Sequence, residues 1–117
     1  MSEEEIKEFW RRFYQALDAG DAETASALFP DGTEIYLWDG TTFRTRAEFR
    51  AWFEALRATS DAASRHIVKL EVKGNRAEVE VVLRARVDGE ERVVRLRHIF
   101  EFEGDRLKRV EVEIEPL

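Results

Sequence analysis

The sequence contains no cysteine and only two histidines and two prolines among its 117 residues. Without cysteine the chain can form no disulfide bond, no thiolate nucleophile and no thiolate metal site. Because two histidines offer a metal centre few ligands, we predict no metal site. No apolar run approaches the roughly 18 residues that span a membrane, and the acidic start MSEEEIKEFW is unlike a signal peptide. We therefore expect a soluble, cytoplasmic protein without a membrane partner.

A surplus of positive charge is also missing. The net charge is −6 and the isoelectric point is near 5.1, so the protein has no charge surplus with which to bind a nucleic-acid backbone. We predict no nucleic-acid partner. Charged residues still make up 38% of the chain, against about 25% in average domains. The chain contains one Asn, one Gln and one Met, and this narrow range of polar residue types resembles computed sequences more than natural ones. The length fits one domain, residues 1–117, whose core needs no crosslinks.

A long first helix is predicted by its capping residues and by apolar residues spaced three or four apart. Ser2 and Glu5 form a capping box at the start of this helix, which spans residues 3–19 and ends at Gly20. Its apolar stripe comprises Ile6, Phe9, Trp10, Phe13, Tyr14 and Leu17. Two polar side chains are unexpected on this apolar face of the helix. Tyr14 is part of the stripe, and Asp18 lies one turn further along the same face.

Two further helices follow. A short one over residues 22–29 is capped by the preceding aspartate, and a longer one begins at a capping box formed by Thr45 and Glu48 and fades near residue 59. The apolar stripe of the longer helix comprises Phe49, Trp52, Phe53 and Leu56. Between these helices, residues 33–38 are predicted to form a strand and residues 41–45 a short extended segment.

From residue 65 the apolar period changes from 3.6 to 2, which predicts strands. Glycine-containing turns separate four of them into an antiparallel meander. The predicted strands span residues 65–73, 76–87, 91–103 and 106–115. Charged residues alternate with apolar ones, so one face of the sheet is free to receive the helices. The fold class is therefore α+β, with three N-terminal helices packed on a curved, mainly antiparallel sheet.

One polar residue faces inward without ambiguity, and another depends on the register of its strand. His98 alternates with apolar residues on the inner face of strand 91–103. In strand 65–73, Ile67 and Leu70 cannot both be buried unless a bulge near Val68 shifts the register. With the bulge, Arg65 and Ile67 face inward; without it, His66 faces inward and Arg65 is exposed. We expect His66 to lie on the surface, and the sequence leaves the position of Arg65 open.

Two interpretations of these polar residues remain. In the first, Tyr14 and His98 satisfy each other, Asp18 is solvated near its helix end and Arg65 is a surface charge. In the second, a cavity holds two neighbouring pairs, Tyr14 with His98 and Asp18 with Arg65. The inward aromatic residues are compatible with a plain core and also permit an apolar pocket for a flat ligand. Trp38 fits the core, the rim of such a pocket or the surface.

The element order and the inward polar residues resemble the nuclear transport factor 2-like fold. This cone-shaped α+β scaffold, which encloses a pocket, is shared by ketosteroid isomerases, scytalone dehydratase and many polyketide cyclases. Within it, the stretches FYQALDAGDAETASALF, LWDGTTF, EFRAWFE and KLEVKG are similar to the LuxSit series of de novo designed luciferases. That resemblance extends over all 117 residues, although the outer faces of the strands depart from it.

The resemblance implies oxidation of a synthetic imidazopyrazinone luciferin, such as diphenylterazine, by O₂ with emission of light. It implies no cofactor, O₂ as co-substrate, the luciferin as the small-molecule partner, and a monomer. Its catalytic residues would be Tyr14, Asp18, Arg65 and His98. Arg65, oriented by Asp18, would stabilise the anionic substrate, while Tyr14 and His98 would hydrogen-bond its carbonyl side and assist proton movement. The substrate-binding residues would be Phe13, Trp38, Trp52, Phe53, Ser60, Val81, Leu83, Leu96, Val110 and Val112.

Two alternatives come from other classes of protein. A ketosteroid isomerase-like or dehydratase-like enzyme would need a carboxylate base on the inner face of the sheet. The predicted inward strand positions contain no Asp or Glu, so this alternative ranks below the luciferase. The other alternative is a non-catalytic designed scaffold that binds a small molecule through the same residues.

Overall fold

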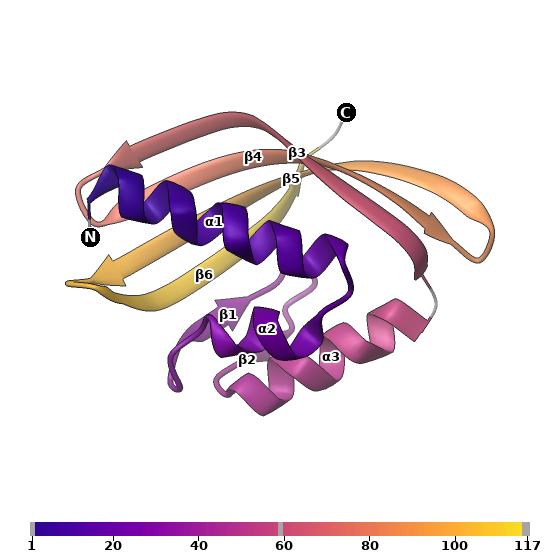
Figure 1. Ribbon diagram of the computed structural model, residues 1–117, viewed down its shortest axis with the longest axis horizontal. Helices are drawn as coiled ribbons and strands as arrows, with labels where there is room; N and C mark the ends of the chain where they lie inside the picture. The colour runs from indigo at the N-terminus through magenta and orange to yellow at the C-terminus, as the bar shows by residue number, and fades with distance from the viewer. Residues whose placement is uncertain (1, 59, 116–117) are drawn as a thin grey trace.

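The chain folds into three helices and a six-stranded sheet. The computed structural model describes residues 2–58 and 60–115, and for residues 60–63 it describes the backbone alone. The helices are α1 (Glu3–Asp18), α2 (Ala22–Ala27) and α3 (Arg46–Ala58), and the strands are β1 (Glu34–Tyr36), β2 (Thr42–Phe43), β3 (Ser60–Lys73), β4 (Arg76–Val87), β5 (Glu90–Glu103) and β6 (Arg106–Glu115). The helices lie on one side of the curved sheet (Figure 1). This confirms the α+β class predicted from the sequence.

The strand order is β2-β1-β6-β5-β4-β3, and the sheet is not closed. Strands β3 to β6 form the predicted antiparallel meander. Strand β1 pairs with β2 in an antiparallel hairpin and with β6 in parallel, so the sheet is mixed. The parallel pairing brings a segment from the first half of the chain beside the C-terminal strand, and it extends the sheet beneath α2 and α3 (Figure 1).

The helix ends follow the predicted caps, with small differences. The Ser2 hydroxyl accepts a hydrogen bond from the Glu5 amide at 3.2 Å, and the Glu5 carboxylate accepts one from the Ser2 amide at 3.4 Å. Helix α2 ends two residues earlier than predicted. Before α3, the Thr45 hydroxyl accepts from the Glu48 amide as expected, but the Glu48 carboxylate accepts from the amide of Arg44 rather than Thr45. Helix α3 still begins at Arg46, directly after the predicted cap Thr45.

Strand β3 contains the bulge that the sequence left open. The pairing with β4 shifts between Ile67 and Lys69, which leaves Val68 as the extra residue. Arg65 consequently lies opposite Leu83 on the inner face, and His66 is exposed as expected. The expectation that Ile67 would join the interior was wrong, because its side chain is 46% exposed. Strand β3 is the edge of the sheet, so Ile67 has a neighbouring strand on one side alone.

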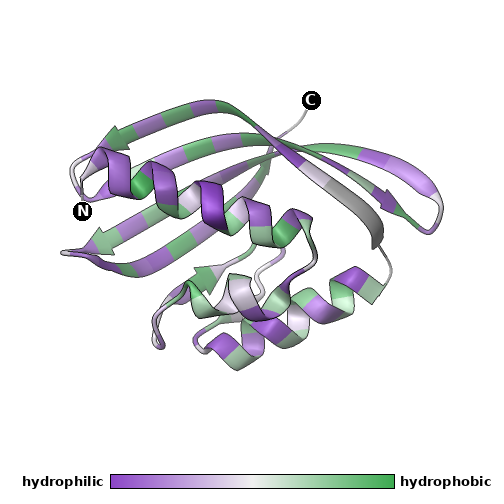
Figure 2. Cartoon of the chain, in the orientation of Figure 1, coloured by the Kyte–Doolittle hydropathy of each residue, from purple (hydrophilic) through white to green (hydrophobic). Residues whose placement is uncertain are grey.

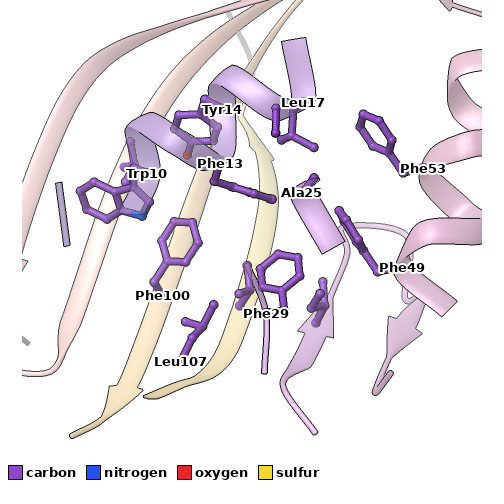
Figure 3. Close-up of a cluster of buried hydrophobic side chains, with 14 of the residues drawn as sticks. Trp10, Phe13, Tyr14, Leu17, Ala25, Phe29, Phe49, Phe53, Phe100 and Leu107 are labelled. Carbon is purple, nitrogen blue, oxygen red and sulfur yellow. The ribbon is translucent and has the colours of Figure 1, made fainter. Parts of the chain in front are cut away.

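The hydrophobic core lies between α1 and the middle of the sheet. Its largest fully buried side chains include Trp10 from α1, Phe53 from α3 and Phe100 from β5. The rings of Trp10 and Phe100 lie 5.4 Å apart, and Figure 3 shows Phe49 and Phe53 reaching from α3 toward α1 and α2. The helices and the inner face of the sheet thus share one aromatic cluster, which fixes α1 across the strands.

Hydrophilic and hydrophobic residues alternate along the strands (Figure 2). Successive side chains point to opposite faces of a sheet, so the charged residues lie on the outer face, as predicted. Arg95 pairs with Glu80 at 3.3 Å across neighbouring strands, and Arg97 pairs with Glu113 at 3.0 Å. Ile99 is buried on this face, where long charged side chains surround it. Such exposed pairs contribute little stability individually, and they keep the outer face of the sheet polar.

Candidate active site

An apolar cavity lies beneath the C-terminal end of α1, between α3 and the inner face of the sheet. Its inner chamber has a volume of about 90 Å³ and adjoins an outer chamber of about 220 Å³. The two chambers share lining residues from α1, α3, β3, β4 and β5, so they form one continuous site. Most of the substrate-binding residues implied by the resemblance line the inner chamber, namely Phe13, Trp38, Trp52, Phe53, Leu83, Leu96, Val110 and Val112.

Val81, one of the implied binding residues, is not among the residues that line the two chambers. It is fully buried in the hydrophobic core. The side chain of Ser60 lies outside the described residues. The structure also adds apolar lining residues that the sequence reasoning did not select, namely Leu17, Phe29, Ile35, Leu37, Phe49 and Leu56. Leu17, Phe49 and Leu56 belong to the predicted apolar stripes, but nothing in a stripe separates residues that face a cavity from those that face the core.

The first polar pair joins α1 to β5. The Tyr14 hydroxyl and the Nδ1 atom of His98 form a short hydrogen bond, and both side chains are buried. Burial and the charge of Arg65 lower the pKa of His98 from 6.5 to about 3. Burial raises the pKa of the Tyr14 hydroxyl well above its ordinary value of 10, and the charge of Arg65 opposes this rise. At neutral pH, therefore, Tyr14 is protonated and donates to a neutral His98.

This hydrogen bond joins the Tyr14 hydroxyl to Nδ1 of His98. We assign Tyr14 as the donor because a phenol O–H is a stronger acid than the N–H of a neutral imidazole, and this assignment puts the ring proton of His98 on Nε2. His98 lines the inner chamber, so it is a hydrogen-bond donor available to a ligand. A histidine that titrates near pH 3 is a poor base at neutral pH. This argues against the expected role of His98 in proton movement and favours a role as a donor.

The second polar pair joins α1 to β3. The Arg65 guanidinium donates from Nη1 to the Asp18 carboxylate at 2.6 Å, and the Arg65 backbone amide donates to the other carboxylate oxygen at 3.2 Å. The Arg65 side chain is 9% exposed, whereas that of Asp18 is 29% exposed. The Nε atom of Arg65 is buried without a hydrogen-bond partner. An unsatisfied buried donor costs about 1 to 3 kcal/mol, and a ligand acceptor in the cavity could satisfy it.

In each pair, one residue lines the cavity and the other holds it in place from α1. Arg65 and His98 line the inner chamber, whereas Tyr14 and Asp18 are absent from its lining and hold their partners from α1. No Asp or Glu is found among the described residues that line either chamber. The polar groups of this apolar site are thus a cation and a neutral donor. Such a site favours a flat ligand that carries an anion or a strong hydrogen-bond acceptor.

The comparisons with known proteins agree with this fold. Residues 10–110 match the SnoaL-like domain family, and the protein therefore belongs to this family. Comparison with curated protein sequences gives no match. Among the described residues, no helix is long and apolar enough to cross a membrane.

Solved structures with the same fold share little sequence with this chain. One is a putative SnoaL-like polyketide cyclase from Shewanella denitrificans, with a TM-score of 0.82, 12% identity, and coverage of 93% of this chain and 89% of that one. An epoxide hydrolase from M. tuberculosis has a TM-score of 0.77, 13% identity and coverage of 92% and 80%. A hypothetical protein with a ketosteroid isomerase-like fold from Catenulispora acidiphila, solved in complex with trimethylamine, has a TM-score of 0.81, 16% identity and coverage of 90% and 83%. At these identities the likeness establishes the nuclear transport factor 2-like fold.

Proposed function

We propose that the protein is a luciferase that binds a planar imidazopyrazinone as its anion and oxidises it with O₂. The observation that carries this proposal is the placement of Arg65 and neutral His98 on the wall of one apolar cavity, with a buried Arg65 Nε that lacks a partner. The resemblance of the sequence to designed luciferases on this fold supports the choice of substrate. Two solved relatives are a putative cyclase and an epoxide hydrolase, so enzymes occur among proteins of this fold.

The chemistry requires an anion, oxygen and an environment without water. Loss of the acidic proton to solvent leaves an anion that transfers electrons to O₂ and forms a carbon–oxygen bond. The resulting peroxide attacks the neighbouring carbonyl carbon, and the bond from this carbon to the ring nitrogen breaks, so that a dioxetanone forms and the nitrogen leaves with the electron pair. Cleavage of its O–O and C–C bonds releases CO₂ and leaves an excited amide, which emits light. One oxygen atom of O₂ leaves in CO₂ and the other remains in the amide, so O₂ is the oxidant and no further co-reactant is needed.

Each residue of the two pairs has a place in this scheme. Arg65 stabilises the substrate anion by charge and through its unpartnered Nε, and this stabilisation is strong in an apolar site. Asp18 is a positioning residue, because its carboxylate holds both the side chain and the amide of Arg65. His98 donates from Nε2 to a substrate acceptor, and Tyr14 fixes its tautomer. The apolar walls exclude water, which would otherwise quench the emitter.

The alternative proton-transfer enzyme has no support from the site. A ketosteroid isomerase-like reaction needs a carboxylate that reaches the substrate, and the described lining residues of both chambers include none. A scaffold that binds without catalysis would use the same cavity. The experiment below is designed to separate these possibilities.

The test is to mix the protein with diphenylterazine and record light, while the quenching of tryptophan fluorescence reports binding through Trp38 and Trp52. We expect saturable binding and sustained light in air-saturated buffer, and binding without light under argon. Binding without light in air would overturn the luciferase proposal in favour of a binding scaffold. Absence of both binding and light would overturn it as well.

A further inference from the structure

The outer chamber carries a second arginine that the proposed chemistry does not use. Arg57 lies in the last turn of α3 and lines this chamber together with Arg65. Its Nη1 atom is buried and has no hydrogen-bond partner. Arg57 is therefore the second arginine of the cavity with an unsatisfied donor, after Arg65. It lines the outer chamber and is not among the lining residues of the inner one.

The turn after α1 holds the Arg57 guanidinium in place. Gly20 adopts a φ of +72°, and a Cβ atom added there would lie 2.8 Å from both Nε and Nη2 of Arg57. The guanidinium therefore packs directly against the backbone of Gly20, where any other residue would displace it. This contact restricts the freedom of a long side chain, so less conformational entropy is lost when a ligand binds to it.

Two of the three arginines that line the outer chamber are neutralised by a carboxylate, and Arg57 is the third. Arg65 is paired with Asp18 at 2.6 Å, and Arg92 is paired with Glu90 at 3.0 Å. Arg57 forms no ion pair within the described part of the chain, and the described lining of the chamber includes no carboxylate. The local field therefore favours an anion beside Arg57.

The rim of the same chamber is apolar and open to solvent. Trp38, Leu56 and Ile114 line it, and their side chains are 49%, 41% and 44% exposed. Large exposed apolar residues gathered at one cavity are typical of a binding surface. A ligand that fits both the rim and Arg57 has an apolar aromatic body and one acidic substituent.

We propose that Arg57 determines specificity by binding a carboxylate or sulfonate on an aromatic ligand whose rings occupy the outer chamber. This inference rests on the proposed function only in assigning the ligand to the same cavity. In the luciferase scheme, Arg57 would select luciferins that carry an acidic group on the ring nearest the opening, whereas Arg65 binds the reacting heterocycle.

A matched pair of fluorescent probes tests this proposal. The first, 1-anilinonaphthalene-8-sulfonate, is an anion, and N-phenyl-1-naphthylamine has the same rings without the sulfonate. Replacing Arg57 with glutamine (R57Q) is expected to weaken binding of the sulfonate about five- to tenfold, as expected for a partly buried charge pair, and to change binding of the neutral probe less than twofold. Arg57→Lys should restore part of the affinity for the sulfonate.

Two control variants locate the effect. Arg84→Gln removes an exposed arginine that pairs with Glu91 and is not among the residues that line the chamber, so binding of both probes should change less than twofold. Ala85→Trp fills the outer chamber, which Ala85 lines, and should weaken both probes together. Circular dichroism of every variant reports whether it is folded.

The proposal is overturned if R57Q weakens both probes equally, or if it lowers thermal stability without changing the ratio of the two affinities. Either result would make Arg57 a structural residue at the end of α3. The probes contain no imidazopyrazinone and undergo no light-emitting oxidation. The result of the probe experiment is therefore independent of the result of the luciferase test.

Discussion

The two ends of the inner face of the sheet have the same pattern of apolar residues and different packing. Val79 and Leu83 share one face of β4, yet Val79 is fully buried in the core whereas Leu83 lines the cavity. On β5, Phe100 is fully buried, and Leu96, four residues earlier, lines the cavity. What differs is the element above each residue. The N-terminal part of α1 fills one end with aromatic side chains, and the other end is left hollow.

The packed end of the inner face stabilises the fold, whereas the hollow end leaves space for a ligand. Packed interiors gain dispersion energy from close contacts, and a hollow loses those contacts. The filled end contains Trp10 and Phe100 in ring contact, and Phe9 lies 6.1 Å from Phe102 in the same cluster. The hollow end contains Arg65 and His98, each held by a polar partner on α1. We therefore expect substitutions at the filled end to affect folding and those at the hollow end to affect binding and light.

The largest expected effect tests the filled end. Phe100→Ala should lower the free energy of unfolding by about 3 to 5 kcal/mol, because it leaves a cavity in a packed cluster. Leu96→Ala should cost about 2 kcal/mol, at the low end for such truncations, because one side of Leu96 already faces a hollow. Urea denaturation measures both. Equal losses would contradict the distinction between a filled and a hollow end.

The second effect tests the hollow end. Arg65→Met should lower light emission per folded protein about 100-fold, or about 2.7 kcal/mol of barrier, the amount typical of losing one oxyanion-stabilising donor. The matched control is Arg84→Met, which removes an exposed arginine from the opposite face of the neighbouring strand. Its emission should stay within twofold of the unmodified protein. Full emission from Arg65→Met would remove the anion-stabilising role.

The third effect is a pH dependence of stability that originates at the hollow end. The pKa of His98 is about 3 in the folded protein and 6.5 ordinarily, so the unfolded chain binds more protons between these values. The contribution of neutral His98 to the free energy of unfolding is therefore fully present above about pH 6.5 and is lost as the solution is acidified. Between pH 7.5 and pH 5 the free energy of unfolding should drop by about 2 kcal/mol.

Replacement of the histidine provides the control for that pH dependence. His98→Gln keeps an acceptor for the Tyr14 hydroxyl and removes the titrating ring, so its unfolding free energy should change much less over the same range. Urea denaturation at several pH values measures both proteins. Parallel pH profiles would show that the dependence originates elsewhere in the chain.

Much of the fold followed from local signals. The bounds of β4 and β6 match the predicted strands, because alternation with period 2 and glycine turns specify a hairpin locally. Strand β3 begins five residues before the predicted start at Arg65, since it continues beside the far end of β4. The parallel pairing of β1 with β6 was not predicted, because it joins segments more than 70 residues apart and no local pattern records it.

The candidate site was predicted less completely than the fold. Tyr14, Asp18 and His98 were identified because each interrupts an apolar face, whereas the position of Arg65 was left open. The structure brings the four residues together as two pairs. The sequence could not show that Val81 lies in the core rather than the cavity wall. It also gave no reason to select Arg57, which is one of many arginines on a helix. Its contact with Gly20 exists only once α1 and α3 are packed.

The sequence by itself determined the element types, the inner faces of β4, β5 and β6, and the presence of unusual polar residues on apolar faces. These depend on period and capping, which are properties of neighbouring residues. The tertiary structure decided the bulge at Val68, the inward position of Arg65 and the division of the inner face into a core and a cavity. Those features depend on how the edge strand is paired and on where α1 ends above the sheet, and both arise from contacts between distant segments.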